Sequence, residues 1–380
     1  MSLNSNIEKY LESLNARGLL RQRQVRRPAT TAVFFDSNDY LSLSTQHFVA
    51  QAYQQGYACF PSGSTGSMLL SGYHPNHQAV EEAFAQALKV DGCILFSSGY
   101  AANLAIAALL AEIDATCYID KYIHASFYDG LHLSKTKYAR FLHNDVDSLS
   151  RQLGSAADNA VIITEGLFSM SGQLAPLVAM KNLMQDKIPL IVDESHSFGI
   201  YGPQGLGLVA LHQLTSEEVP LRMISLGKAC AAQGAIIAGK KAWLDALLQA
   251  GRSIIYSTAI SPALSYGLLK TLDGLLMADE RRERLFQRIA FFQEQVVLSS
   301  LPWNKSNSAI QFLHLGCPHR AVALDRALKA EGYYCSAVRV PTVSKQKTGL
   351  RIVLNCDHTE EQIRLLFKTI HRLYEHSLCN

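Results

Sequence analysis

A lysine and an aspartate each lie at the end of an apolar segment whose pattern predicts a β-strand. Lys228 comes two residues after the segment Met223–Leu226, and Asp193 ends the segment Leu190–Asp193. A lysine amine can bind an aldehyde covalently, and a carboxylate can pair with a pyridinium nitrogen. At neighbouring strand ends, these two groups are what a pyridoxal phosphate enzyme requires. Each residue alone has an ordinary explanation, since most lysines are solvated and an aspartate after a strand often caps a helix.

A glycine-containing turn between a predicted strand and a helical pattern offers a place for a phosphate. The turn is Ser97–Asn103, and it includes Gly99 and Tyr100. Free backbone N–H groups and the positive end of the helix dipole favour an anion at such a turn. Ser225, three residues before Lys228, could add a hydroxyl to the same site. The alternative is a tight strand-to-helix turn that binds nothing.

Three further polar residues follow predicted strands. His124 could stack on a flat cofactor ring, although a lone histidine at a strand end more often caps a helix. Ser169 could reach the substituents of the ring. His196, three residues after Asp193, could donate to a ring hydroxyl oxygen. A metal is not expected here, because Asp193 and His196 alone supply too few ligands for a metal site.

The composition limits the class of protein. The chain of 380 residues is 48% hydrophobic and 18% charged, as is usual for a soluble globular protein. A net charge of +3 does not favour nucleic-acid binding. We expect no membrane segment, because no apolar run could cross a bilayer and the N-terminus lacks a signal-peptide core. The eight cysteines are scattered without a C-x-x-C pair, so we expect no zinc site and a cytoplasmic location.

Strand-like segments recur along the first two thirds of the chain. Several are apolar throughout, which favours parallel strands that are buried on both faces. The segments between them are mostly long enough for crossover helices, such as the one expected around residues 103–110. We therefore expect an α/β domain with a mostly parallel sheet. The expected strands are 93–96, 116–120, 161–165, 190–193, 223–226 and 235–238.

The two ends of the chain have different patterns. Ser5 and Glu8 form a capping box that predicts a short helix ending near Gly18, before an arginine-rich connector. The C-terminal pattern predicts strands at 310–315, 333–338 and 350–354, with helices at 321–331 and from Thr359 onward. We divide the chain into an N-terminal helix and connector (1–40), a large α/β domain (41–280) and a smaller C-terminal α+β domain (281–380).

Short motifs over almost the whole chain are similar to those of one known family. They are Ser37–Leu41, Gly63–Ser67, Leu70–Gly72, His77, Ser98–Asn103, His124–Ser126, His143–Asp145, Glu165–Met170, Asp193–His196, Tyr256–Thr258, Ala337–Thr342 and Thr348–Ile352. Together they resemble the α-oxoamine synthases, which are fold-type I pyridoxal phosphate transferases. The resemblance implies a large, mostly parallel sheet domain, a smaller C-terminal domain and a homodimer with active sites at the interface.

The resemblance also implies roles for the matching residues. Lys228 would bind the cofactor covalently, His124 would stack on its ring, and Asp193 and His196 would bind its nitrogen and hydroxyl side. The residues implied around the phosphate are Gly99, Tyr100 and Ser225, with Thr258 supplied by the partner subunit.

Three residues match positions that bind the substrates. Asn38 and Arg339 match residues that hold the carboxylate of the amino acid. Arg21 matches an arginine near the distal carboxylate of the acyl chain.

Some residues depart from the pattern of the family. Ser42 stands where glycine is usual after Asn-x-Tyr-Leu, and Ser195 stands where alanine is usual. Met68 stands where a basic residue is frequent. Cys230 and Ala231 replace a bulkier, glycine-containing pair after the lysine. No catalytic group is lost.

Within this family, the chain is most similar to the branch that condenses L-alanine with a pimeloyl thioester in biotin synthesis. The acyl group could arrive on coenzyme A or on an acyl carrier protein. The competing sister activities are 2-amino-3-ketobutyrate ligase, 5-aminolevulinate synthase and acyl-amino-ketone signal synthase. A lyase or aminotransferase of the same fold is a further alternative. A non-catalytic partner subunit is disfavoured, because such subunits typically lose the lysine that Lys228 matches.

Overall fold

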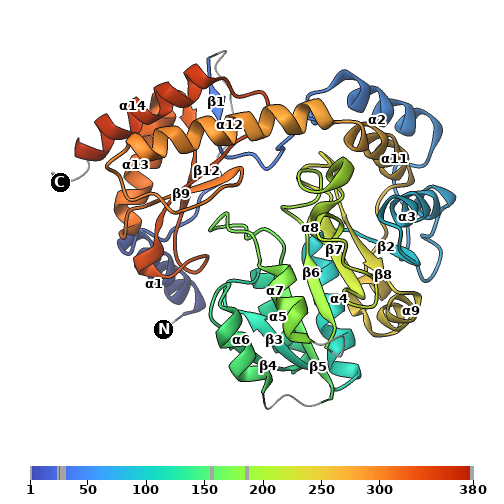
Figure 1. The fold of residues 1–380 in the computed structure, drawn as a ribbon. Helices are drawn as coiled ribbons and strands as arrows, with labels where there is room; N and C mark the ends of the chain where they lie inside the picture. Colours follow the sequence, from blue (N-terminus) through green and yellow to red (C-terminus); the bar gives the residue numbers. More distant parts are fainter. Residues whose placement is uncertain (1, 24, 26–30, 155–157, 185–187, 377–380) are drawn as a thin grey trace. The chain divides into compact units, whose positions relative to one another are not determined.

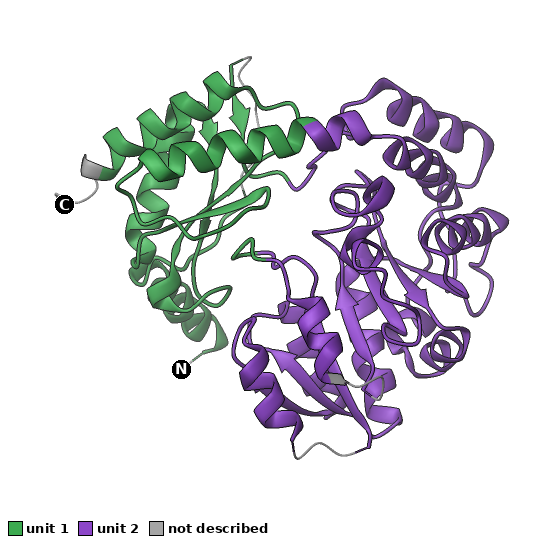
Figure 2. Cartoon of the chain, viewed as in Figure 1, with its two compact units in different colours: residues 1–37, 170–173, 284–380 green, residues 38–169, 174–283 purple. Residues whose placement is uncertain are grey.

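The chain divides into two compact units (Figure 2). The computed structural model describes residues 2–23, 25, 31–154, 158–184 and 188–376. The larger unit comprises residues 38–169 and 174–283, and the smaller unit comprises 1–37, 170–173 and 284–380. The division drawn from the sequence separates residues 1–40 from 281–380, whereas the structure groups most of both segments in the smaller unit. Strand β1 (Val33–Phe34) links them, because it pairs with β10 (Tyr333–Tyr334).

A seven-stranded sheet forms the centre of the larger unit (Figure 1). Its order is β2 (Gly92–Phe96), β8 (Ala235–Gly239), β7 (Leu221–Ser225), β6 (Leu190–Asp193), β5 (Ala160–Glu165), β3 (Thr116–Asp120) and β4 (Lys137–Phe141). The five strands from β7 to β4 are parallel, and β8 runs antiparallel to both of its neighbours. The expected mostly parallel α/β sheet is therefore confirmed.

The central strands of this sheet are buried on both faces because helices cover them. Strands β5, β6 and β8 consist only of buried residues. Helix α4 is itself almost entirely apolar, and seven of its residues are buried along a broad face, as expected of a helix that packs inside a three-layer fold. The helices are α2 (His47–Cys59), α3 (Pro75–Leu88), α4 (Gly99–Glu112), α5 (Ala125–Ser134), α6 (Val146–Leu153), α7 (Leu177–Met184), α8 (Gly207–Leu211), α9 (Lys241–Ala250), α10 (Arg252–Ile255) and α11 (Pro262–Leu276), with the 3-10 turn η1 (Pro203–Gly205).

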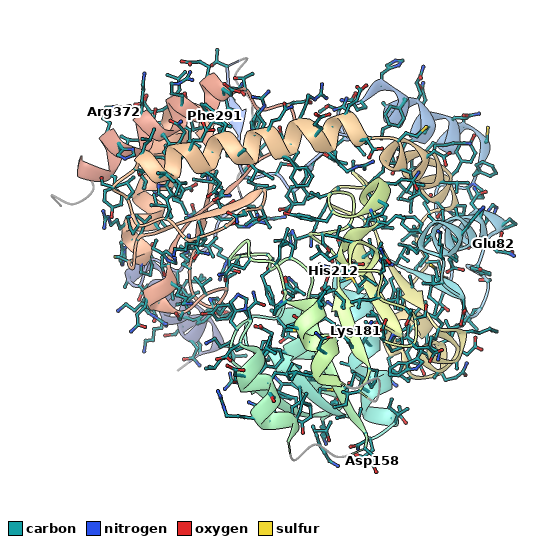
Figure 3. The ribbon with its side chains drawn as sticks, in the orientation of Figure 1. Glu82, Asp158, Lys181, His212, Phe291 and Arg372 are labelled. Atoms are coloured by element: carbon teal, nitrogen blue, oxygen red, sulfur yellow. The ribbon has the colours of Figure 1, made fainter. Side chains whose placement is uncertain are left out.

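The smaller unit contains an antiparallel sheet with the order β11 (Ser336–Val338), β12 (Gly349–Val353) and β9 (Ile310–His314). Its other elements are α1 (Leu3–Ala16), α13 (Pro318–Ala330), α14 (Glu360–His376) and the 3-10 turn η2 (Lys345–Lys347). The boundary between the units falls within α12 (Asp279–Leu298). Arg372 on α14 forms an ion pair of 3.0 Å with Glu331 at the end of α13 (Figure 3 labels Arg372).

Three local expectations differ from the structure. Strand β4 was not expected, because it lies at the edge of the sheet and its Lys137 and Arg140 interrupt the apolar pattern. Helix α1 is capped by Ser2, whose hydroxyl accepts from the Ser5 N–H, so Ser5 is not the cap. The expected strand 333–338 is two separate strands, since β10 and β11 join different sheets. In the described part of the chain, no helix combines the length and the apolarity that a bilayer crossing requires.

Candidate active site

Four neighbouring parallel strands end with polar residues at one edge of the sheet. Strands β3, β5 and β6 end at Asp120, Glu165 and Asp193, and β7 ends at Ser225, three residues before Lys228. These strands are adjacent in the order β7, β6, β5, β3. Ligands of open parallel sheets bind outside the carboxyl ends of the strands. We call this group of residues, with the histidines described below, the sheet-edge site.

Asp193 is held in one orientation by two hydrogen bonds. The Ser195 N–H donates to Oδ1 at 2.9 Å, and the Asn103 side-chain amide on α4 donates to Oδ2 at 3.2 Å. The carboxylate is only 4% exposed. The two donors lie on different oxygens, so they fix the orientation of the Asp193 carboxylate. Asn103 was not among the expected site residues, although the motif Ser98–Asn103 contains it.

His124 caps helix α5 and is fixed by that role. Its Nδ1 lies 2.8 Å from the Ser126 hydroxyl and accepts from the Ser126 N–H at 3.3 Å. Burial lowers the pKa of His124, and the nearby Lys228 lowers it further, while Asp193 opposes this shift. The result favours a neutral, immobile ring. Capping and stacking are therefore compatible roles, because the cap sets the orientation of the ring.

Lys228 contacts a histidine from the neighbouring strand end. Its Nζ lies 2.9 Å from His196 Nε2, and His196 Nδ1 lies 2.6 Å from the Tyr40 hydroxyl. Tyr40 is fully buried, and its hydroxyl lies 3.4 Å from Asn38 Oδ1. Asn38, Tyr40, His196 and Lys228 thus form a continuous row of polar side chains in the larger unit.

The turn that opens α4 offers backbone N–H groups to an anion. Ser98 caps the helix by accepting from the Ala101 N–H at 3.2 Å. A Cβ on Gly99 would lie 3.6 Å from the Ser225 Cβ, so the turn and the end of β7 are close neighbours. Tyr100 is 45% exposed, and its hydroxyl donates to Asp129. Gly99, Tyr100 and Ser225 are therefore neighbours at the positive end of a helix.

Thr258 belongs to the larger unit. It forms an isolated antiparallel bridge with Ser67, whose hydroxyl is buried without a hydrogen-bond partner. Its assignment to the site of a partner subunit stays a prediction.

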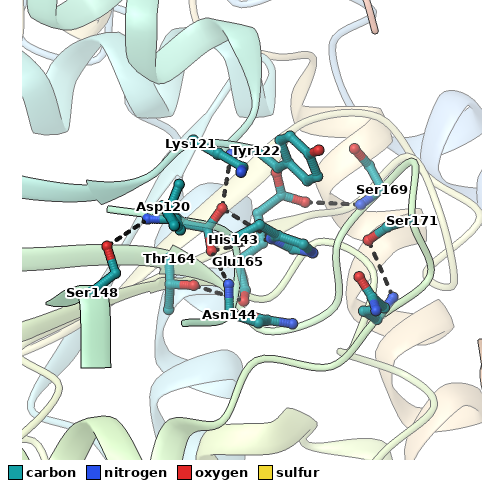
Figure 4. A network of polar contacts seen from close by, with 12 residues as sticks. Asp120, Lys121, Tyr122, His143, Asn144, Ser148, Thr164, Glu165, Ser169 and Ser171 are labelled. Atoms are coloured by element: carbon teal, nitrogen blue, oxygen red, sulfur yellow. Dashed lines mark hydrogen bonds and ion pairs between the residues drawn. The ribbon is translucent and has the colours of Figure 1, made fainter. Parts of the chain in front are cut away.

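Glu165 and Asp120 are buried carboxyl groups in very different surroundings (Figure 4). Asp120 accepts from the backbone N–H groups of Tyr122 and Asn144, both at 2.8 Å, and from His143. Glu165 Oε2 accepts only from the Ser169 N–H at 3.0 Å, and its Oε1 has no partner. Burial, followed by the charge of Asp193, raises the pKa of Glu165 well above its usual range. Glu165 therefore favours its protonated form more than an ordinary glutamate does, and it was not among the predicted site residues.

The smaller unit contains a pocket of about 380 Å³ that is lined by three arginines. We call it the arginine pocket; its lining residues are Arg21, Gln22, Met170, Ser336, Ala337, Val338, Arg339, Thr342 and Arg351. Arg339 donates to the Leu20 carbonyl at 2.9 Å, and Arg21 donates to the Val340 carbonyl at 3.3 Å. Burial and the charge of Arg21 lower the pKa of Arg339, whose Nε has no partner. Such a pocket favours carboxylates.

The residues that were expected to bind the substrates belong to different units of the chain. Arg21 and Arg339 line the arginine pocket of the smaller unit, whereas Asn38 belongs to the larger unit. Arg351 was not predicted as a site residue, although the motif Thr348–Ile352 contains it; the segment was predicted only to form a strand.

The departures from the family pattern have local explanations. Ser42 and Ala231 both have φ of +50°, the region in which glycine is favoured. The Ser195 hydroxyl accepts from the Ser225 N–H at 3.2 Å, so it ties the ends of β6 and β7 together. Met68 is partly buried against the core of the larger unit.

The sheet-edge site fits pyridoxal phosphate in its chemistry. An oriented aspartate, a lysine amine, a neutral fixed imidazole and a helix N-terminus are the groups that a pyridinium ring, an aldehyde and a phosphate require. Gly99 leaves the helix N-terminus without a side chain that would cover it. Among the described residues, no group of three or more histidine, cysteine, aspartate and glutamate side chains could hold a metal ion.

Comparisons with known proteins agree on one family. The model of the aminotransferase class I and II family matches residues 30–370. An 8-amino-7-oxononanoate synthase from Pseudomonas putida is 38% identical over 342 residues, which cover 90% of this chain and 87% of the relative. The crystal structure of 8-amino-7-oxononanoate synthase from Francisella tularensis is 30% identical, covers 92% of this chain and all of that chain, and has a TM-score of 0.81.

A second group of solved structures shares the fold. Serine palmitoyltransferase from S. paucimobilis, solved with a pyridoxal phosphate–myriocin adduct, covers 99% of both chains with a TM-score of 0.91. Its sequence identity is only 24%, so this likeness concerns the fold alone.

Proposed function

Because the chain belongs to the aminotransferase class I and II family, and within it to the 8-amino-7-oxononanoate synthases, we propose that it condenses L-alanine with a pimeloyl thioester. The products are 8-amino-7-oxononanoate, carbon dioxide and the free thiol carrier, and the reaction belongs to biotin biosynthesis. The observation that carries this proposal is the lysine Nζ next to His196, beside a buried and oriented Asp193.

Pyridoxal phosphate, when bound, supplies an electron-accepting ring that stabilises negative charge on the amino-acid Cα. Asp193 would pair with the ring nitrogen, because the two donors from Ser195 and Asn103 keep its carboxylate directed. His124 would pack on the face of the ring. His196 and Ser169 would bind at its hydroxyl side.

The phosphate would lie at the start of α4. Gly99 and Tyr100 supply backbone N–H groups there, and Ser225 supplies a hydroxyl. Thr258 of the partner subunit would complete the phosphate site, so we propose a homodimer in which each active site needs both chains.

Lys228 would act as the acid–base group of the reaction. With alanine bound, the free amine of Lys228 would remove the Cα proton and later return a proton to the product. The contact of 2.9 Å with His196 keeps the Nζ directed while it is free. Loss of carbon dioxide follows bond formation between the alanine Cα and the acyl carbon, with release of the thiol.

Asn38 and Arg339 would hold the carboxylate of alanine, and Arg21 would bind the distal carboxylate of the pimeloyl chain. Arg351 adds a third guanidinium to the arginine pocket, so the pocket has more positive charge than one carboxylate needs. The thiol carrier would be coenzyme A or an acyl carrier protein, and the protein would act in the cytoplasm.

The test is mass spectrometry of the products formed by the pure protein with pyridoxal phosphate. Alanine, glycine and serine would each be combined with pimeloyl, acetyl, succinyl and palmitoyl thioesters, on coenzyme A and on carrier protein. We expect a product from alanine and the pimeloyl thioester, and none without the cofactor. Turnover of another pair would replace the substrate assignment and keep the fold. No product from any pair would contradict the proposed reaction.

A further inference from the structure

A second pocket, of about 420 Å³, lies within the larger unit and shares no residue with the sheet-edge site. We call it the apolar pocket. Its lining residues come from segment 87–90 at the end of α3, from segment 203–216 around η1 and α8, and from Val219 and Arg222 near the start of β7. None of them has a part in the proposed reaction, which therefore leaves the purpose of this pocket open.

The walls of the apolar pocket are mostly hydrophobic. Leu88, Val209 and Val219 line it, and each of them is buried. Pockets of about 300–1,000 Å³ with apolar walls and a few placed polar groups are typical of sites for small molecules. The walls therefore suit the apolar body of a small ligand, and the polar part of such a ligand must meet one of the few polar side chains.

The buried guanidinium of Arg222 gives the pocket a specific polar group. Arg222 is only 3% exposed. Its Nε donates to Glu194 Oε2 at 2.7 Å, while its Nη2 forms an ion pair with the same carboxylate and donates to the Leu206 carbonyl at 2.5 Å. Within the described chain, Nη1 makes no hydrogen bond and is not fully enclosed. Its N–H groups are therefore available to a ligand in the pocket that Arg222 lines.

The charges at the apolar pocket match one negative charge. Lys89 and Arg222 are its two cationic lining residues, and no described residue that lines it carries a carboxylate. Glu194, which is fully buried behind Arg222, balances one of these two positive charges. The Val209 N–H also donates to Glu194, at 3.0 Å, so this carboxylate is held in place and in turn holds the guanidinium. One positive charge remains for a ligand.

We propose that the apolar pocket binds a small monocarboxylate with an apolar body, whose carboxylate accepts from the Nη1 group of Arg222. Hydrogen bonds between a guanidinium and a carboxylate are charge-assisted, and they are stronger than those to a neutral acceptor. The apolar body packs against the hydrophobic walls. This inference does not rest on the proposed function, because the pocket shares no residue with the arginine pocket or the sheet-edge site.

The probe is hexanoate, and the measurement is a ligand-observed NMR titration of the protein loaded with pyridoxal phosphate. The matched neutral probe is 1-hexanol, which has the same chain and no charge. We expect hexanoate to bind about 10-fold more tightly than 1-hexanol, because only hexanoate forms a charged hydrogen bond with Arg222. Equal affinities for the two probes, or no binding of hexanoate to the wild type, would overturn the inference.

A substitution that fills the pocket tests where hexanoate binds. Ala210 on α8 lines the pocket and is partly buried, so Ala210→Phe adds a ring there and should weaken hexanoate binding at least about 10-fold. The control is Leu211→Phe on the same helix, because Leu211 is 45% exposed and does not line the pocket. It should bind hexanoate like the wild type. Thermal midpoints check both folds, and Ala87→Phe makes the same test from α3 if Ala210→Phe does not fold.

The arginine pocket is the competing site for a carboxylate, so Arg339→Gln is measured in parallel. We expect this variant to retain the tight binding of hexanoate that Ala210→Phe loses. Binding that is lost in Arg339→Gln and unaffected by Ala210→Phe would place hexanoate in the arginine pocket and would overturn the inference.

Discussion

The sheet-edge site and the arginine pocket are both polar, but they are built in opposite ways. At the sheet edge, side chains bond to one another: Asn103 donates to Asp193, and His196 contacts Lys228. In the arginine pocket, Arg21 and Arg339 donate to backbone carbonyls. No residue that lines the pocket in the described chain carries a carboxylate. One region has its charges balanced before any ligand arrives, and the other has an excess of positive charge.

This difference separates two kinds of ligand. A resident cofactor needs groups that are already oriented, since preorganised dipoles and charges cost no reorganisation during the reaction. A carboxylate substrate binds and leaves in every reaction cycle. Its site needs an excess of positive charge, because each guanidinium must still have N–H donors for the substrate when it binds. The sheet edge therefore suits the cofactor and the proton transfers. The arginine pocket suits substrate binding.

The largest expected effect concerns the sheet edge. Lys228→Ala removes the proposed covalent link to the cofactor and the proposed proton acceptor, so turnover should fall by at least about 10⁴-fold. The fold should survive, because Lys228 makes a polar contact and leaves no core cavity when it is shortened. Product formation measured by mass spectrometry, beside the thermal midpoint of the apoprotein, checks both statements. Substantial turnover in this variant would disprove the assigned role of Lys228.

The next effect concerns the arginine pocket. Arg339→Gln removes a charged donor and relieves its repulsion with Arg21. The KM for alanine should rise by about 10–100-fold, since a hydrogen bond to a charged group is worth about 1.5–3 kcal/mol. The free energy of unfolding should hardly change. Steady-state kinetics with varied alanine, together with urea unfolding, measure the two quantities.

A matched control for Arg339 is available in the connector of the same unit. Arg23→Gln removes a positive charge from an exposed side chain that does not line the pocket. It should leave the KM for alanine unchanged. Equal effects of the two substitutions would show that general positive charge, and not the pocket, attracts the substrate.

The third effect concerns Glu165 at the sheet edge and the pH dependence of the unfolding free energy. Its pKa is raised in the folded protein, so the folded state binds a proton that the unfolded state loses above a pH of about 4.5. Stability must then fall as the pH rises above that value. Glu165→Gln keeps the shape and cannot ionise. Between pH 5 and 7, its unfolding free energy should increasingly exceed that of the wild type as the pH rises, because only the wild type has a carboxyl group that the unfolded state can ionise.

Urea unfolding at several pH values checks the Glu165 prediction. Glu294→Gln is the control, because Glu294 is an exposed residue of α12. The unfolding free energy of the Glu294→Gln variant should equal that of the wild type at every pH. A Glu165→Gln curve that is parallel to the wild-type curve would mean that Glu165 is ionised in the folded protein.

The sequence was sufficient to place the main groups of the sheet edge. Apolar segments that end in a polar residue indicate buried parallel strands, and the structure confirms that β6 and β7, which precede His196 and Lys228, are neighbours. The contact between Tyr40 and His196 could not be predicted, because it joins residues that are 156 positions apart. The protonation of Glu165 depends on burial and on its neighbour Asp193, so no local pattern reveals it.

The arginine pocket was harder to predict. Arg21 and Arg339 were found only through the resemblance to known enzymes, and Arg351 was missed. The residues that line the arginine pocket come from the connector, from residue 170 and from the C-terminal segment. Arginines on such segments look like solvated surface residues until the fold brings them together. Pattern reasoning therefore succeeds where one sheet orders the residues and fails where separate segments converge.

The smallest expected effect concerns the backbone. In the described chain, every non-glycine residue with positive φ belongs to the larger unit, whereas the smaller unit has only glycines there. Ala231 is one of these non-glycine residues, and it has a φ of +50° in the turn that follows Lys228. Ala231→Gly should raise the thermal midpoint by about 1–2 °C, since the relief of a left-handed alanine exceeds the entropic cost of glycine. Ala232→Gly, at negative φ, should lower it, and equal shifts for both would mean that the turn stores no strain.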